Sequence, residues 1–136
     1  MHLVIDGYDG DAAKLKDSDL VQRFLDSYPN TIGMTKLMSP HVLTYDGPKR
    51  EDWGISGFVI IAESHISVHT FPERQYINID IFSCKDFDTS KALEDVKMTF
   101  SLDKVSAWTL DRGLEHLSTQ AALRAIDADR RKLLSG

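Results

Sequence analysis

Three short apolar runs follow one another between Phe58 and Phe82, and turn-forming or polar residues separate them. In the second and third runs, aliphatic residues alternate with polar or aromatic ones, as in Ile77-Asn78-Ile79-Asp80-Ile81. A period of two places successive side chains on opposite faces of a β-strand. The connecting segments are too short for a crossover helix, so this pattern predicts three neighbouring antiparallel strands.

The two turns between these strands set which residues share a face. Taking Glu63-Ser64 as the first turn and 72–75 as the second pairs Phe58 with His69 and His69 with Asn78. One face is then aliphatic and suited to lie under helices: Val59, Ile61, Ile66, Val68, Ile77, Ile79 and Ile81. The other face mixes polar groups with apolar rings and chains: Ser56, Ser67, His69, Asn78, Asp80 and Cys84 with Phe58, Ile60, Phe71 and Phe82. Such a face is suited to a ligand site or a subunit contact.

The flanking sequence predicts the remaining elements. Strands are expected at 2–6, 33–39 and 104–110, with a polar loop at 45–54. Helices are expected at 17–28, where Asp19 and Gln22 resemble a capping box, and after Asp88, with a peripheral one from Leu114. Strands in runs with helices between them predict a single α+β domain over 1–136. It would be a two-layer sandwich, a mainly antiparallel sheet with helices on one face.

Composition excludes several functional classes. The chain has 136 residues, 42% of them hydrophobic, and a net charge of −5 without a basic stripe, which argues against a nucleic-acid partner. No apolar run approaches the roughly 20 residues of a membrane span, and the N-terminus does not resemble a secretory signal. Cys84 is the single cysteine, so no disulfide can form within the chain. We therefore expect a cytoplasmic protein.

The turn residues Glu63-Ser64 conflict with their position. A two-residue hairpin turn favours Gly, Asn or Asp, and such conflicts tend to occur at strained or functional sites. The Ser64 hydroxyl could attack the preceding carbonyl and convert the amide into an ester. Removal of the Ser64 α-proton would then expel Glu63 as a carboxylate. The dehydroalanine left behind hydrolyses to a pyruvoyl group, a built-in ketone that forms a Schiff base with an amine.

A longer stretch supports this chemistry. The residues GISGFVIIAESHISVHTFPE, followed by YINIDIFSC, resemble the prokaryotic S-adenosylmethionine decarboxylase family, which is pyruvoyl-dependent and acts in polyamine (spermidine) biosynthesis. The resemblance is strongest from Gly54 to Cys84. It implies a proenzyme, or zymogen, whose autocatalytic cleavage between Glu63 and Ser64 yields a β chain of residues 1–63 and an α chain of 64–136. It also implies a homodimer whose sheets pack face to face, with active sites at the interface.

The resemblance assigns roles to matching positions. Ser64 would be the pyruvoyl precursor and Schiff-base site, His69 the base that takes the α-proton, and Ser56 an aid to processing. Cys84 would protonate the α-carbon after decarboxylation, and Glu73 would bind substrate. Phe71 stands where relatives often have tryptophan, and Phe71, Tyr45 or Trp53 could stack on adenine.

Other interpretations remain open. The loop before Gly54 is longer than in typical family members, so a pyruvoyl-dependent arginine or ornithine decarboxylase is an alternative to S-adenosylmethionine as substrate. An unprocessed homologue that only binds a partner is a second alternative. We expect no metal site, because His65 and His69 would lie about 13 Å apart along one strand. The sequence does not indicate an activator.

Overall fold

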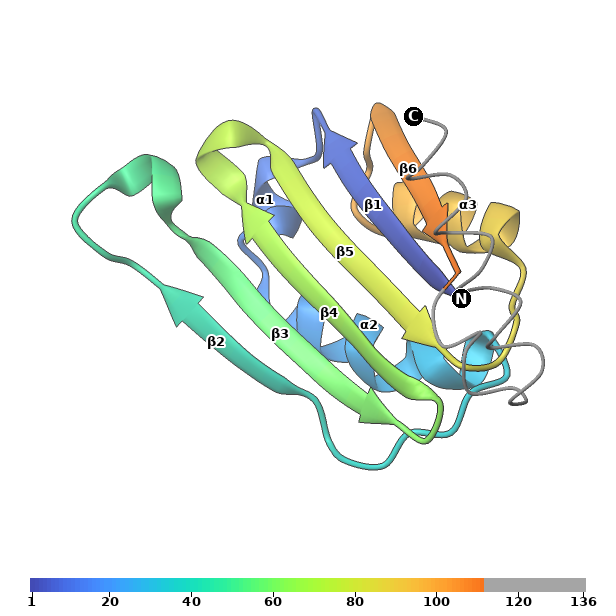
Figure 1. Ribbon diagram of the computed structural model, residues 1–136. Coiled ribbons are helices and arrows are strands. Elements are labelled where there is room, and N and C mark those ends of the chain that lie inside the picture. The colour runs from blue at the N-terminus through green and yellow to red at the C-terminus, as the bar shows by residue number, and fades with distance from the viewer. Residues whose placement is uncertain (112–136) are drawn as a thin grey trace, which may run out of the picture.

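The computed structural model describes residues 1–111, so the helix expected from Leu114 lies outside the described residues. A six-stranded antiparallel sheet forms one layer, in the order β2-β3-β4-β5-β1-β6 (Figure 1). The strands are β1 (His2–Tyr8), β2 (His41–Tyr45), β3 (Gly54–Ile61), β4 (Ser64–Phe71), β5 (Tyr76–Ser83) and β6 (Lys104–Leu110). The expected three-strand run is β3, β4 and β5, the second, third and fourth strands in this order.

The helices α1 (Ala12–Leu15), α2 (Ser18–Thr31) and α3 (Thr89–Thr99) form the second layer (Figure 1). Short 3-10 turns, η1 (Arg50–Asp52) and η2 (Pro72–Arg74), lie in two of the loops. The expected α+β class is confirmed, with all three helices on one face of the sheet. No helix among residues 1–111 is long and apolar enough to cross a membrane.

Aspartates begin the two longer helices. Asp88 accepts a hydrogen bond from the Lys91 amide, as its predicted N-cap position requires. The capping box at Asp19 was wrong, because Asp17 caps α2 by accepting from the Leu20 amide at 3.1 Å. Asp19 then occupies the first helical turn, where a carboxylate still interacts favourably with the helix dipole.

The aliphatic face of the sheet packs against the helices as predicted. Its residues are fully or almost fully buried, together with Phe24, Leu25 and Val96 from α2 and α3. Gly57 permits a close approach of α2, because a Cβ there would lie 2.8 Å from Leu25 Cδ1. Burial of this apolar surface is the main favourable term that holds the two layers together.

The strand predicted at 33–39 was wrong. Within that segment only Lys36 forms a β-bridge, to Ile61, and the edge strand β2 begins later, at His41. The segment is instead bound to the first hairpin by backbone hydrogen bonds from Ala62 to Thr35 (2.8 Å) and from Leu37 to Ile60 (3.0 Å). Pro40 lacks an amide hydrogen and ends this pairing, after which β2 pairs further along β3.

Opposite the helices lies a face of the sheet that no described helix covers, which we call the open face (Figure 1). It contains the mixed polar and apolar residues predicted from the sequence. Phe58 and Ile60 are each 40% exposed on it. Further exposed apolar side chains occupy both edge strands at positions of the same face: Leu43, Tyr45, Trp108 and Leu110.

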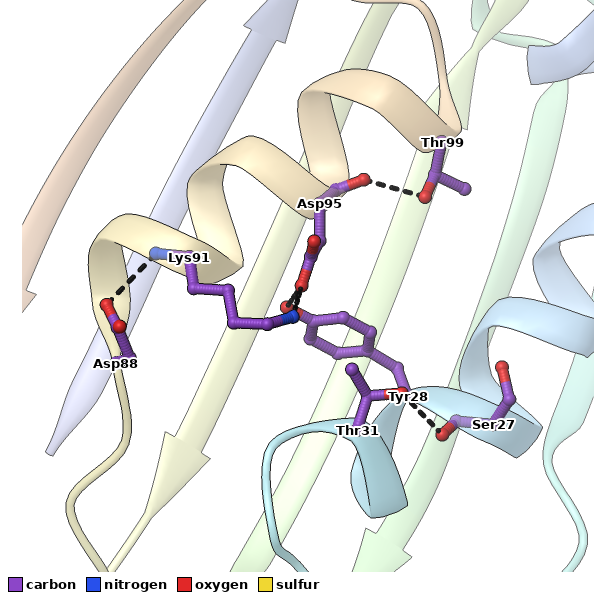
Figure 2. A network of polar contacts seen from close by, with 7 residues as sticks. All are labelled: Ser27, Tyr28, Thr31, Asp88, Lys91, Asp95 and Thr99. Atoms are coloured by element: carbon purple, nitrogen blue, oxygen red, sulfur yellow. Dashed lines mark hydrogen bonds and ion pairs between the residues drawn. The ribbon is translucent and has the colours of Figure 1, made fainter.

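A polar cluster joins α2 to α3 on the helical layer (Figure 2). The Tyr28 hydroxyl donates to Asp95 Oδ2 at 2.9 Å, and Lys91 Nζ donates to the same oxygen at 2.6 Å. Burial, followed by the bond to Asp95, raises the pKa of Tyr28, so its hydroxyl stays protonated. The hydrogen bond from Lys91 lowers the pKa of Asp95, so the carboxylate stays charged.

Candidate active site

The hairpin between β3 and β4 contains the predicted cleavage bond. Ile61 pairs with Ser64, so Ala62 and Glu63 form the two-residue loop and Ser64 is the first residue of β4. The predicted turn at Glu63-Ser64 was therefore wrong by one residue at each side, and the pairing partners on β3 shift by two. Because the shift is even, every side chain keeps its predicted face. The pairing of β4 with β5, including His69 with Asn78, is as predicted.

Ser64 has a strained backbone. Its φ of 154° lies in a region that residues with a Cβ rarely adopt and that is typical of glycine. Neither Ala62 nor Glu63 is a favoured residue for a tight hairpin loop, so the local sequence does not relieve this strain. The strained torsion is the one about the Ser64 N–Cα bond, which is directly next to the Glu63–Ser64 peptide bond.

Two contacts hold Glu63 in place. Its carbonyl oxygen accepts a hydrogen bond from the Cys84 amide at 2.9 Å, which links the loop to the residue just beyond β5. Its side-chain Oε1 accepts from the Thr35 amide at 3.0 Å. A donor on the carbonyl oxygen draws electron density from the carbonyl carbon and would stabilise a negative charge that develops on the oxygen during attack.

Cys84 directly follows β5. Its thiol is free and exposed, next to the buried end of β5. The hydrogen bond to Glu63 uses the backbone of Cys84, so the thiol is not consumed by it. Cys84 thus contacts the carbonyl of the predicted cleavage bond through its amide, and its thiol takes no part in that contact.

Ser56 and His69 form a direct pair on the open face. They are opposed in the β3–β4 ladder, and Ser56 Oγ lies 2.8 Å from His69 Nδ1. The predicted opposition of Phe58 to His69 was wrong, because the pairing of β3 with β4 is shifted by two residues. The pair lies in a depression of about 200 Å³ lined by His41, Leu43, Ser56, Gly57, Phe58, Ser67 and His69.

Within one chain, however, His69 is far from Ser64. They are five positions apart along β4, about 16 Å at roughly 3.3 Å per residue. The register also assigns them to different faces, because Ser64 is opposite buried Ser83 and His69 is on the open face. The structure therefore groups Glu63, Ser64 and Cys84 at one place and Ser56 with His69 at another.

Glu73 lies in η2, between β4 and β5, and lines a separate cleft of about 280 Å³. Arg50 donates to Glu73 Oε1 at 3.1 Å, and its guanidinium lies 5.5 Å from the centre of the Trp53 ring. Tyr45 also lines this cleft. Phe71 is outside it and packs against Tyr76, with ring centres 5.8 Å apart.

Sequence reasoning missed the backbone contacts that anchor the turn. Thr35 and the Cys84 amide act through main-chain groups, which every residue but proline carries, so no side-chain pattern identifies them. Arg50 was not singled out, although it follows a basic residue in a long polar loop. No group of three or more His, Cys, Asp or Glu side chains in residues 1–111 is placed to hold a metal ion.

Comparison with known families decides among these interpretations. A family model described as "S-adenosylmethionine decarboxylase" matches residues 1–113. The chain belongs to the S-adenosylmethionine decarboxylase family. The described fold and the cleavage turn both lie within the matched residues.

Individual relatives extend this family assignment. An S-adenosylmethionine decarboxylase proenzyme of Thermotoga maritima is 32% identical over 113 residues, which cover 82% of each chain. One of Clostridium botulinum is 33% identical over 113 residues, covering 82% of this chain and 92% of the relative. The crystal structure of the adenosylmethionine decarboxylase from Aquifex aeolicus has the same fold, with a TM-score of 0.66 at 22% identity over 82% of this chain and 92% of that one.

Proposed function

We propose that this chain is a proenzyme that cleaves itself between Glu63 and Ser64, and that the product decarboxylates S-adenosylmethionine. Family membership makes it a pyruvoyl-dependent S-adenosylmethionine decarboxylase, a carboxy-lyase of polyamine synthesis. The assignment of the bond and of the pyruvoyl precursor rests on one observation. The strained Ser64 directly follows a carbonyl that is already hydrogen-bonded to the Cys84 amide.

Cleavage needs only groups of the chain and one water molecule. Ser64 Oγ attacks the Glu63 carbonyl carbon, a C–O bond forms, the C–N bond breaks, and the hydroxyl proton passes to the released nitrogen. Removal of the Ser64 α-proton then breaks the bond between Ser64 Cβ and Oγ and releases Glu63 as the carboxyl end of 1–63. The dehydroalanine at residue 64 takes up water and loses ammonia, which leaves a pyruvoyl group on 64–136.

The residues at this turn fit a group made from serine. A hydroxyl residue occupies a strained position where relief of strain favours rearrangement, and the scissile carbonyl has a donor in place. In the reaction, the pyruvoyl ketone supplies an electron sink for the substrate that loses CO₂. We propose the exposed Cys84 thiol as the acid that delivers a proton to the carbon left by CO₂.

We propose His69 as the base for the α-proton and Ser56 as its positioning partner. Ser56 Oγ fixes one ring nitrogen of His69 at 2.8 Å, which leaves Nε2 free for proton transfer. Because roughly 16 Å of strand separates His69 from Ser64 in one chain, the base must come from a second copy. A homodimer with open faces packed together, as the exposed Phe58 and Ile60 favour, would bring the two groups to one site.

The Glu73 cleft is the proposed site for the adenosyl part of the substrate. The Trp53 and Tyr45 rings there can stack on a base or contact a sulfonium, and the Glu73 carboxylate can accept from ribose hydroxyls. The Arg50 side chain is bonded to Glu73 and lies over the Trp53 ring, so it must move for the substrate to bind both residues. Phe71, outside the cleft, would contact the substrate only from the open face.

Labelled CO₂ release tests the substrate. Carboxyl-labelled S-adenosylmethionine, arginine and ornithine are incubated separately with fully cleaved protein. We expect release from S-adenosylmethionine alone, and none from any substrate with Ser64→Ala protein. Release from arginine or ornithine instead would overturn the substrate assignment. A chain that stays uncut and releases no CO₂ would favour the non-catalytic binding homologue.

A further inference from the structure

We propose that Ser83 is a positioning residue for self-cleavage: its buried hydroxyl fixes the turn that presents the Cys84 amide to the Glu63 carbonyl. This inference rests on the proposed cleavage at Glu63-Ser64. Ser83 is the last residue of β5 and lies directly opposite Ser64 in the ladder. Cys84 follows it and makes the hydrogen bond to Glu63.

Ser83 interrupts the aliphatic pattern of its strand. The other positions of β5 on the core face are Ile77, Ile79 and Ile81, and each has 0% exposure. Ser83 is equally buried, at 0%. Burying a hydroxyl in an apolar layer costs free energy unless it is hydrogen-bonded, so an aliphatic residue would suit the core better here. The hydroxyl must therefore be explained by what it binds.

The hydroxyl binds both backbone groups of Lys85. Ser83 Oγ accepts from the Lys85 amide at 2.9 Å and donates to the Lys85 carbonyl at 2.7 Å. It also lies 3.5 Å from the sulfur of buried Met34. These contacts fix the backbone on both sides of Cys84, because Ser83 is held by the sheet and Lys85 is held by Ser83.

A second contact ties the same turn to the segment below the cleavage loop. Lys85 Nζ donates to the Gly33 carbonyl at 3.1 Å, and Thr35, two residues on, donates its amide to Glu63 Oε1. The Cys84 amide and the Glu63 carbonyl are thus positioned by connected segments. Loss of the Ser83 hydroxyl would release Lys85 from Ser83 and let the Cys84 amide move away from the carbonyl it polarises.

Two variants of equal shape isolate the hydroxyl. Ser83→Thr keeps it, whereas Ser83→Val replaces it with a methyl group. In the Ser64→Ala background, which cannot be cut, ¹⁵N-cysteine labelling gives a single backbone amide signal, because Cys84 is the only cysteine. We expect that amide to exchange with solvent roughly tenfold or more faster in the Val variant than in the Thr variant, as loss of a hydrogen bond implies.

Self-cleavage of the chain with Ser64 intact is the second readout. We expect Ser83→Thr to cut at close to the wild-type rate and Ser83→Val to cut about tenfold to 10²-fold slower, since small misplacements of reacting groups cost on that order. Melting temperatures of both variants check that they fold. If Val destabilises the core, Ser83→Ala, which removes only the oxygen, takes its place in both measurements.

The outcomes separate this inference from the function on which it rests. Equal cleavage rates and equal Cys84 exchange in the Thr and Val variants would overturn the positioning role and leave self-cleavage intact. An uncut wild-type chain would instead contradict the proposed function. The exchange comparison would then still decide whether Ser83 fixes the Cys84 amide.

Discussion

At the scale of single residues, the cleavage turn combines strain with polarisation. A non-glycine residue at a φ such as that of Ser64 costs on the order of 1–3 kcal/mol, and it persists only if its surroundings hold it. The contacts from Cys84 and Thr35 to Glu63 supply that restraint. If the chain cleaves at Glu63-Ser64, as we propose, breaking the peptide bond would release this strain and favour the reaction.

The two roles that we propose for Cys84, its backbone in cleavage and its side chain in catalysis, can be separated by mutation. Cys84→Ala keeps the amide that binds Glu63, so we expect normal self-cleavage. Loss of the thiol acid should slow decarboxylation by roughly 10²–10⁴-fold. Cleavage is measured by denaturing electrophoresis and turnover by CO₂ release, with Cys84→Ser as the matched control for side-chain size. Unchanged turnover in Cys84→Ala would remove the thiol from the mechanism.

At the scale of elements, the sequence predicted which face of the sheet each side chain of β3, β4 and β5 occupies. It did not predict which residues of β3 and β4 pair. Alternation in β4 and β5 assigns each residue to a face, and the shift of two in the β3 pairing left Ser56 and His69 on the predicted face. The turn itself could not be placed from composition, because none of Ala62, Glu63 and Ser64 is a residue that two-residue hairpin loops favour. The segment 33–39 has apolar residues like a strand, but Pro40 ends its pairing after one bridge.

The Tyr28–Asp95 contact joins the two longer helices, and its loss should weaken the helical layer. We expect Tyr28→Phe to lower the free energy of unfolding by about 1.5–3 kcal/mol, the range for a hydrogen bond to a charged group. Denaturant unfolding measures the change. Ser27→Ala, which removes only an exposed bond within α2, serves as the control and should be nearly neutral. Equal effects of the two variants would contradict this account.

The hydrogen bond from Lys91 to Asp95 predicts that stability depends on pH. Lys91 lowers the pKa of Asp95 in the folded state below its unfolded value of about 3.9. Its stabilisation is therefore fully present above the unfolded pKa and is lost as the pH falls through the folded pKa. The stability difference between the wild type and Asp95→Asn should be constant near neutral pH and shrink below about pH 4. A difference that grows on acidification would have the wrong sign.

At the scale of the whole molecule, one chain contains the residues of the proposed site but does not bring them together. The cleavage turn and Cys84 lie at one end of β4 and β5, whereas His69 with Ser56 and the Glu73 cleft lie toward the other. The spacing of Ser64 and His69 along β4 implies this separation already in the sequence, but the resemblance assigned both residues to one site without regard to it. The open face has exposed apolar residues over several strands, and we propose it as the surface through which a second copy would complete the site.

A mixed dimer tests this arrangement. Ser64→Ala chains cannot be cut, and His69→Ala chains alone should stall with the ester that hydroxylamine cleaves. Co-expressed and separately tagged, the two variants should form dimers in which the His69→Ala chain is cleaved by the His69 of its partner. His65→Ala, on the same strand and face, should process normally. Absence of cleavage in purified mixed dimers would contradict a shared site.

Intact mass of the purified wild-type protein tests the central claim most directly. The account predicts two chains, 1–63 ending in a free Glu63 carboxyl and 64–136 lighter by one ammonia than a serine-initiated chain. That deficit is specific to conversion of Ser64 into a pyruvoyl group. Two chains without the deficit would indicate simple hydrolysis of the bond. A single uncut chain that persists in solution would contradict self-cleavage altogether.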